Sequence, residues 1–130
     1  MDSKISFDTL TFAVDHNKGP HGISKIINAS TKGQKFSDVA NKLKSEFDKG
    51  NPLAISKFKD IAEYKNLGRE GIYNCKKSLF KDNDTQKIEI WNKGDKYALR
   101  RGFHRCLALY FSGDAHVDAN HENVELKLGM

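Results

Sequence analysis

Cationic side chains inside the most apolar stretch of the chain are the first residues that could do chemistry. Between QKIEIW and LALYF lies the sequence KYALRRGFHRC, in which four of them follow Lys96, and a tyrosine comes after these four: Arg100, Arg101, His104, Arg105 and Tyr110. The planar guanidinium of arginine suits the oxygens of a phosphate, and histidine exchanges a proton near neutral pH. Together they are the groups that metal-independent cleavage of an RNA phosphodiester requires, with Tyr110 positioning or stacking on a base. The alternative is an ordinary sheet whose polar side carries Arg and His.

Two further histidines lie in the polar tail GDAHVDANHEN. His116 and His121 are five residues apart, with Asp114, Asp118 and Glu122 around them. Either histidine would supply the second proton-transfer group if the tail returns to the arginine-bearing strand. Imidazoles and carboxylates also suit zinc, iron or manganese, but this spacing matches no standard metal motif. An exposed polar loop is the ordinary interpretation, and we predict neither a metal nor a cofactor.

A series of lysines suggests a surface that holds a phosphate backbone without reading its sequence. The residues assigned to this role, with one arginine from the apolar stretch, are Lys35, Lys42, Lys44, Lys57, Lys59 and Arg105. The competing interpretation is a set of solvated helix faces, which is about equally compatible with the pattern.

Composition places the chain among small globular proteins. It has 130 residues, 38% hydrophobic and 30% charged, with a formal net charge of +5, and we expect a single domain over residues 1–130. Residues 21–81 hold thirteen Lys and Arg against six acids, whereas residues 112–130 are acidic. A basic surface attracts polyanions. The sequence has no apolar run of the roughly 20 residues that span a bilayer and no signal-peptide pattern, so we expect a cytoplasmic protein, with two free thiols at Cys75 and Cys106.

Hydrophobic periodicity locates the elements of the N-terminal half. Residues 9–14 alternate as a strand, and a short helix is indicated within residues 21–30. The clearest helix covers residues 34–49, where Phe36, Val39, Ala40, Leu43 and Phe47 share one face. Asn51 and Pro52 then begin a second helix over residues 52–66, so that the two form a tight helical hairpin. A DNA-reading helix-turn-helix is the alternative, but its turn is usually longer.

The C-terminal half predicts mainly strands. Residues 71–80 are compatible with a strand, and residues 87–91 and 96–101 form a hairpin around the turn NKGD. Residues 103–111 fit either a strand or a helix. We favour the strand because of Gly102 and the aromatic content. Residues 124–128 predict a last strand.

The order of elements indicates an α+β fold. We expect an N-terminal strand and the helical hairpin to pack on one face of an antiparallel sheet formed mainly by the C-terminal half. This order, together with KYALRRGFHRC, resembles small bacterial ribonuclease toxins of the RelE/ParE type, in which a helical pair precedes a sheet with basic and histidine residues. The resemblance rests on layout alone and assigns no residue a role.

Three functional hypotheses follow. The leading one is a small basic RNA-binding domain that acts as a metal-independent endoribonuclease of toxin type. The second is a non-catalytic inhibitor, immunity or phage-type regulatory protein that binds an acidic protein partner. The third, which is weaker, is a metal-dependent enzyme that uses residues 114–122.

Overall fold

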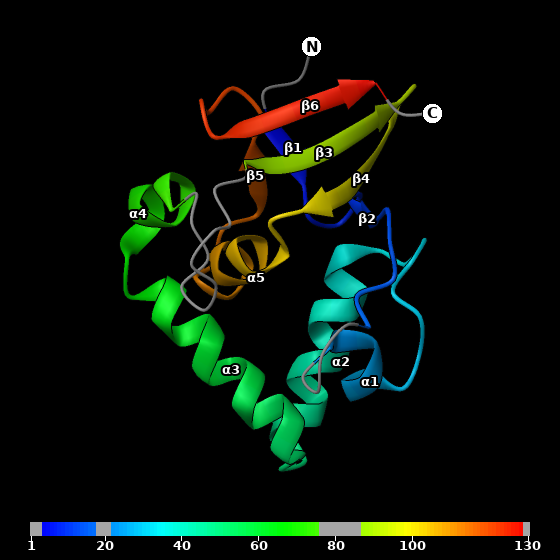
Figure 1. Cartoon of the computed structure of the whole chain (residues 1–130), viewed down its shortest axis with the longest axis vertical. Helices are drawn as coiled ribbons and strands as arrows, with labels where there is room; N and C mark the ends of the chain where they lie inside the picture. The colour runs from blue at the N-terminus through cyan, green and yellow to red at the C-terminus, as the bar shows by residue number, and fades with distance from the viewer. Residues whose placement is uncertain (1–3, 18–21, 76–86, 129–130) are drawn as a thin grey trace.

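The computed structural model describes residues 4–17, 22–75 and 87–128. Five helices and six strands lie in these ranges. In chain order they are β1 Lys4–Ser6, β2 Thr11–Phe12, α1 Ile23–Ile27, α2 Phe36–Asp48, α3 Pro52–Lys65, α4 Gly68–Asn74, β3 Ile88–Lys93, β4 Lys96–Arg101, α5 Phe103–Phe111, β5 His116–Asp118 and β6 Val124–Leu128. Figure 1 shows the sheet strands at one end and the helices α1, α2 and α3 at the other.

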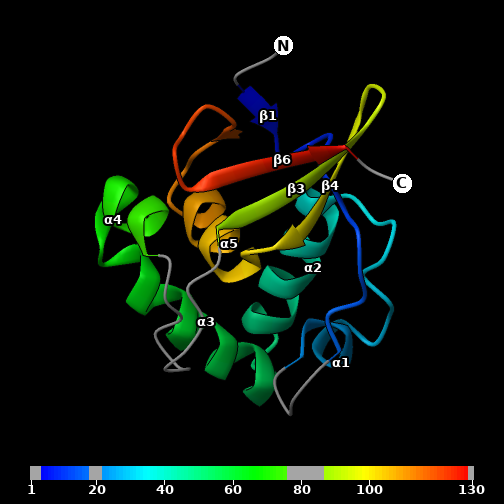
Figure 2. The same cartoon turned by 45° about the horizontal axis from the view of Figure 1, so that its top comes forward.

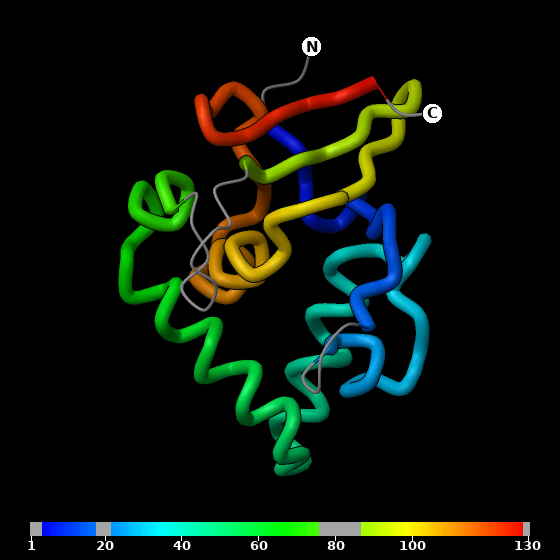
Figure 3. The backbone as a smooth tube through the Cα atoms, viewed as in Figure 1, coloured from blue at the N-terminus to red at the C-terminus, as the bar shows by residue number. Residues whose placement is uncertain are grey.

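The main sheet has four strands in the order β2-β4-β3-β6. The hairpin of β3 and β4 is antiparallel, as predicted, but β2 runs parallel to β4 and β6 runs parallel to β3. The α+β class is therefore confirmed, whereas the predicted antiparallel sheet is a mixed one. Figure 3 shows the reason: α5 and β5 separate β4 from β6, so the chain has crossed the molecule before β6 joins the edge. The strands β1 and β5 pair with each other in a second, two-stranded antiparallel sheet.

The predicted helical hairpin is present as α2 and α3. The face of α2 expected to be apolar is buried at Phe36, Val39 and Leu43. Asn51 begins α3 as predicted, because its side chain accepts a hydrogen bond from the backbone N–H of Leu53 at 3.0 Å. The strand predicted over residues 9–14 is reduced to the two residues of β2.

The strand favoured for residues 103–111 is wrong: this segment is the helix α5. Five consecutive residues of α5, from Arg105 to Leu109, are buried. A helix that is buried on nearly all sides shows no single apolar stripe, so its sequence does not reveal the helical period. Gly102 separates β4 from α5 with φ of 88°, which is a conformation that glycine adopts readily.

The strand suggested for residues 71–80 is also incorrect where it is described. Residues 71–74 belong to α4, in which the neighbours Ile72 and Tyr73 are both buried. Adjacent side chains of a strand point to opposite faces, so two adjacent buried side chains do not fit a strand that has one face in solvent. The remainder of that prediction, residues 76–80, lies outside the described residues.

The core lies between the main sheet and the helices. Ile88 and Ile90 of β3 and Leu99 of β4 point inward and are fully buried, as are Leu107 and Leu109 of α5. Figure 2 shows α2 and α5 behind the strands β3, β4 and β6, and in the described chain no helix covers the face of the sheet toward the viewer. That uncovered face presents the alternate side chains of these strands. None of the described helices is both long and apolar enough to span a membrane.

Candidate functional site

The uncovered side of the main sheet carries a group of polar and aromatic residues. We call it the outer sheet face, and it consists of Lys87, Glu89, Trp91, Lys93, Arg100, Arg101, Glu125 and Lys127. Side chains alternate along a strand, so Glu89 and Trp91 point away from the core that Ile88 and Ile90 enter. In β4 the register shifts, because Leu99 pairs with Ile90 but Arg101 pairs with Glu89, and the adjacent Arg100 and Arg101 therefore both reach the outer side. Pairing of β3 with β6 then places Glu125 beside Glu89 and Lys127 beside Trp91.

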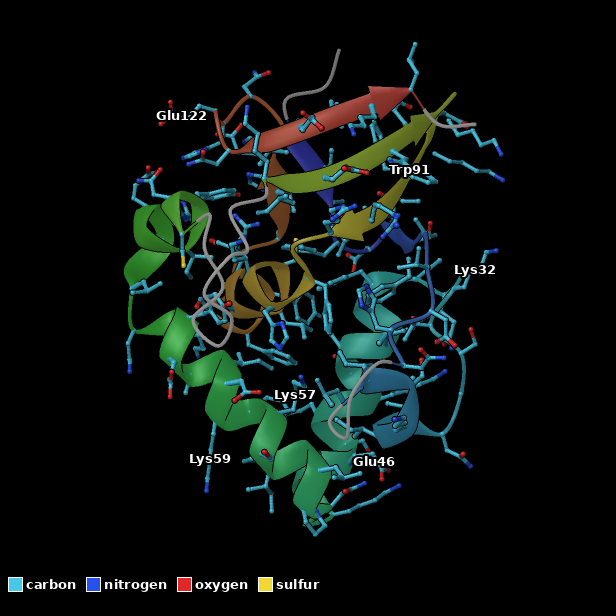
Figure 4. All side chains as sticks on the ribbon, viewed as in Figure 1. Lys32, Glu46, Lys57, Lys59, Trp91 and Glu122 are labelled. Carbon is cyan, nitrogen blue, oxygen red and sulfur yellow. The ribbon has the colours of Figure 1, made fainter. Side chains whose placement is uncertain are left out.

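Trp91 is half-buried on this face, and the guanidinium of Arg100 lies over its ring. The guanidinium carbon of Arg100 lies 5.9 Å from the centroid of the Trp91 ring, within the range of cation–π attraction. The indole Nε1–H donates to Oε2 of Glu89 at 2.7 Å, which restrains the rotation of the ring. Both interactions hold the indole in one orientation. Figure 4 shows Trp91 at the sheet end of the molecule.

Glu89 is the centre of the charges on this face. Its Oε1 lies 3.3 Å from Nζ of Lys127 and 3.7 Å from Nε of Arg101, and its side chain is 12% exposed. Burial by itself would raise the pKa of Glu89. Hydrogen bonds from Trp91 and Lys127 and the positive charges of Lys127 and Arg101 outweigh burial and lower this pKa below its usual value. Glu89 is therefore ionised at neutral pH.

A hollow opens in front of Glu89. It has a volume of about 360 Å³ and is lined by Lys87, Glu89, Arg101, Glu125 and Lys127. The hollow is open to solvent, and every side chain that lines it is charged. Its walls combine three cations with two carboxylates, so they suit a ligand that has both acidic oxygens and N–H donors.

A second group of functional interest lies on the helical side, between α3 and α5. Nζ of Lys57 is 3.1 Å from Nε2 of His104 and 3.9 Å from Oδ2 of Asp60, and the lysine is only 5% exposed. Burial lowers the pKa of Lys57, and the nearby charge of Asp60 opposes this only in part. Two protonated groups in contact would repel each other, so one member of the Lys57–His104 pair donates and the other accepts.

Aromatic rings enclose the Lys57–His104 pair. The ring of Tyr64 stacks on His104 at 5.8 Å between centroids, and Phe103 stacks on it at 4.8 Å. His16 in turn lies 4.0 Å from Phe103. This arrangement can transfer a proton between two side chains, and it joins α3 to α5.

The six residues predicted as catalytic are distributed over β4, α5, β5 and the turn before β6. Arg100 contacts Trp91 and Arg101 contacts Glu89, so these two share the outer sheet face. His104 contacts Lys57, and Tyr110 Oη donates to Oδ1 of Asn41 at 3.4 Å.

The tail histidines occupy yet another region. His121 stacks on Tyr73 and lies 3.3 Å from Oε2 of Glu70, while His116 pairs with Ser6 between β5 and β1. Asp114 forms an ion pair with Arg69. Over the described ranges no three His, Cys, Asp or Glu side chains converge as metal ligands would, so residues 114–122 form no metal site there.

The six residues predicted to bind nucleic acid also divide. Lys35, Lys42, Lys44 and Lys59 are exposed, although Lys42 donates to Gln34 and Lys44 pairs with Asp48. Lys57 and Arg105 are buried, and neither is available at the surface as that prediction required. Figure 4 shows Lys59 pointing outward from α3 and Lys57 pointing inward.

Sequence reasoning overlooked Trp91 and Glu89. Their signal is present in KIEIWNK, where Ile88 and Ile90 occupy one face of the strand and Glu89 and Trp91 the other. The pattern indicates which residues share the outward face, but it does not reveal that none of the described helices covers this face (Figure 2).

Comparison with protein-family models, curated proteins and solved structures finds no match to this chain. Any statement about its activity therefore depends on the geometry of the outer sheet face and of the Lys57–His104 pair.

Proposed function

We propose that this protein binds single-stranded RNA through the outer sheet face. The observation that carries the proposal is the Trp91–Arg100 pair on a sheet face that no described helix covers. Proteins bind single-stranded RNA by stacking its unpaired bases on aromatic rings and arginine guanidinium planes. Glu89 holds the indole through its Nε1–H, so little freedom is lost when a base stacks on it.

The charges of the outer sheet face support the same function. Five cations stand there against two carboxylates, and Lys93 and Lys127 are exposed. A positive surface beside a stacking platform attracts the phosphate backbone without regard to base sequence. The net charge of +5 for the whole chain favours the encounter further.

The test uses Trp91 as its own reporter, because it is the one tryptophan in the sequence. Titration with a single-stranded RNA in low salt is expected to quench its fluorescence. Trp91→Ala should weaken binding, followed by anisotropy of labelled RNA, by about 1–3 kcal/mol, and Trp91→Phe should retain most of the affinity. Equal affinity of the wild type and a folded Trp91→Ala variant would overturn the proposal.

Cleavage of the bound RNA is a separate prediction. It rests on the Lys57–His104 pair, which can hold and exchange a proton but lies on the helical side and not on the outer sheet face, so cleavage does not follow from binding at the sheet. Incubation of RNA with the protein in EDTA, compared with His104→Ala and Lys57→Met, tests this prediction. RNA that stays intact at high protein concentration would leave binding as the activity.

A second candidate function is binding of an acidic protein partner. The observation that favours it is the edge strand β6, which pairs with β3 on one side and carries Leu128 at 90% exposure. An edge strand can accept a further strand from a partner. A stoichiometric complex with one acidic protein, abolished by Leu128→Asp and retained by Trp91→Ala, would favour this candidate over RNA binding.

A further inference from the structure

We propose that the hollow in front of Glu89 selects guanine, with the Glu89 carboxylate accepting hydrogen bonds from the base edge. This inference rests on the proposed RNA binding and adds to it a preference for one base. The selected guanine would occupy the hollow, and a neighbouring base would stack on the Trp91–Arg100 pair, which Glu89 joins to the hollow through the indole Nε1–H.

The position of Glu89 supports a role in recognising the edge of a base. The carboxylate lies between the edge of Trp91 and the hollow, which it helps to line. Trp91, Lys127 and Arg101 contact the carboxylate, and they fix its orientation as well as its charge. An ionised carboxylate has about four acceptor positions, so these contacts leave capacity for donors that enter from the solvent side.

The chemistry of the base edges explains why guanine would be preferred. The Watson–Crick edge of guanine presents two adjacent donors, N1–H and the 2-amino group, which match the two oxygens of a carboxylate as a bidentate pair. Adenine, cytosine and uracil each present a donor next to an acceptor on that edge. The acceptor would face the negative carboxylate, and one hydrogen bond at most would form.

The remaining walls of the hollow fit the rest of a nucleotide. Lys87, Arg101 and Lys127 supply cations that can contact the phosphates on either side of the base. Glu125 lies beside Glu89 on the neighbouring strand, but its side chain is 44% exposed and it pairs with Lys127. Glu125 thus shares the hollow with Glu89, so the control is taken outside it, at Glu63, which is exposed on α3.

The experiment compares heptamers of sequence UUUNUUU, in which N is guanine, hypoxanthine, adenine, cytosine or uracil, by anisotropy at one salt concentration. Hypoxanthine keeps N1–H and lacks the 2-amino group. We expect the wild type to bind the guanine heptamer about tenfold more tightly than the all-uracil heptamer, with hypoxanthine intermediate. Glu89→Gln, whose amide oxygen can still accept from the Trp91 indole, should reduce the guanine preference to less than about twofold relative to its own affinity for the all-uracil heptamer, and Glu63→Gln should keep the preference.

Each outcome separates this inference from the binding on which it rests. Equal affinity of the wild type for all five heptamers would overturn guanine selection and leave RNA binding intact. A guanine preference that survives in Glu89→Gln would overturn the role of Glu89. Equal affinity for the guanine and hypoxanthine heptamers would do the same, because hypoxanthine lacks the 2-amino group. Failure to bind any heptamer would overturn the proposed function itself. The hypoxanthine comparison uses only the wild type, so it decides the question even if a variant does not fold.

Discussion

At the scale of single residues, Lys57 shows how the tertiary structure decides whether a lysine is exposed or buried. Its neighbour Lys59 is exposed on the same helix, yet Lys57 is buried between α3 and α5 against His104. A long side chain can turn inward along the apolar surface, but its ammonium group then loses most of its water. A carboxylate oxygen of Asp60 is 3.9 Å away, and its charge compensates only partly for the lost water.

The buried lysine predicts a pH-dependent stability. Burial lowers the pKa of Lys57 in the folded chain below the ordinary 10.5, so the unfolded chain binds more protons in the interval between the two values. The free energy of unfolding should therefore rise as the pH increases from the folded pKa toward 10.5. Lys57→Met should lack this rise and be more stable at pH 7 by about 1 kcal/mol.

Urea denaturation at pH 7 and pH 10 measures both effects. Lys59→Met is the matched control, because that lysine is exposed and one half-turn away, and it should change stability little at either pH. A wild type that loses stability between these two pH values more steeply than Lys57→Met would contradict the assignment.

At the scale of elements, the junction between β4 and α5 decides how the centre of the molecule is built. Gly102 has φ of 88°, and a Cβ at this position would lie 2.9 Å from Cγ1 and 3.1 Å from Cα of Ile88. The glycine thus lets the chain leave the sheet and enter a buried helix while passing directly against β3. Residue preferences for strands in FHRCLALYF are overruled by this packing.

Gly102→Ala should destabilise the protein by about 1–3 kcal/mol through strain and the contact with Ile88. Gly94→Ala is the matched control: Gly94 also has a positive φ, of 68°, but a Cβ there would meet nothing within 4 Å. Thermal unfolding followed by circular dichroism should show a larger loss for Gly102→Ala. A Gly94→Ala variant that is equally or more destabilised would show that close packing at the junction contributes nothing.

The elements also explain why the site was only partly predicted. The hairpin of β3 and β4 and the helix pair were foreseen from their periodicity, and Arg100 and Arg101 were recognised on the strand that bears them. Arg105 and His104 were expected on that same sheet, but they follow Gly102 into α5 and lie on the helical side. One misassigned element therefore divided a predicted cluster into two.

At the scale of the whole molecule, two surfaces of the described residues carry exposed positive charge: the outer sheet face and the lysines of the helices. Only the outer sheet face also offers a stacking platform. Two triple variants with equal loss of charge compare them: Lys93→Gln with Arg101→Gln and Lys127→Gln on the sheet, and Lys35→Gln with Lys42→Gln and Lys44→Gln on the helical side.

The sheet variant should weaken RNA binding and reduce the slope of log affinity against log salt concentration by about 2, since each phosphate contact on a single strand contributes about 0.7. The helical variant should change the slope by less than about half that amount. Anisotropy at four salt concentrations gives both slopes. A larger effect of the helical variant would move the RNA site to the lysines of α2.

The sequence by itself determined the helix pair, the cap at Asn51, the hairpin and the basic character of the chain, because periodicity, capping and charge are local properties. Tertiary structure alone decided that FHRCLALYF is a buried helix, that Lys57 meets His104, and that Glu89 and Trp91 stand on an uncovered face. These outcomes depend on which surfaces meet, and contacts between segments distant in the chain leave no period in the sequence.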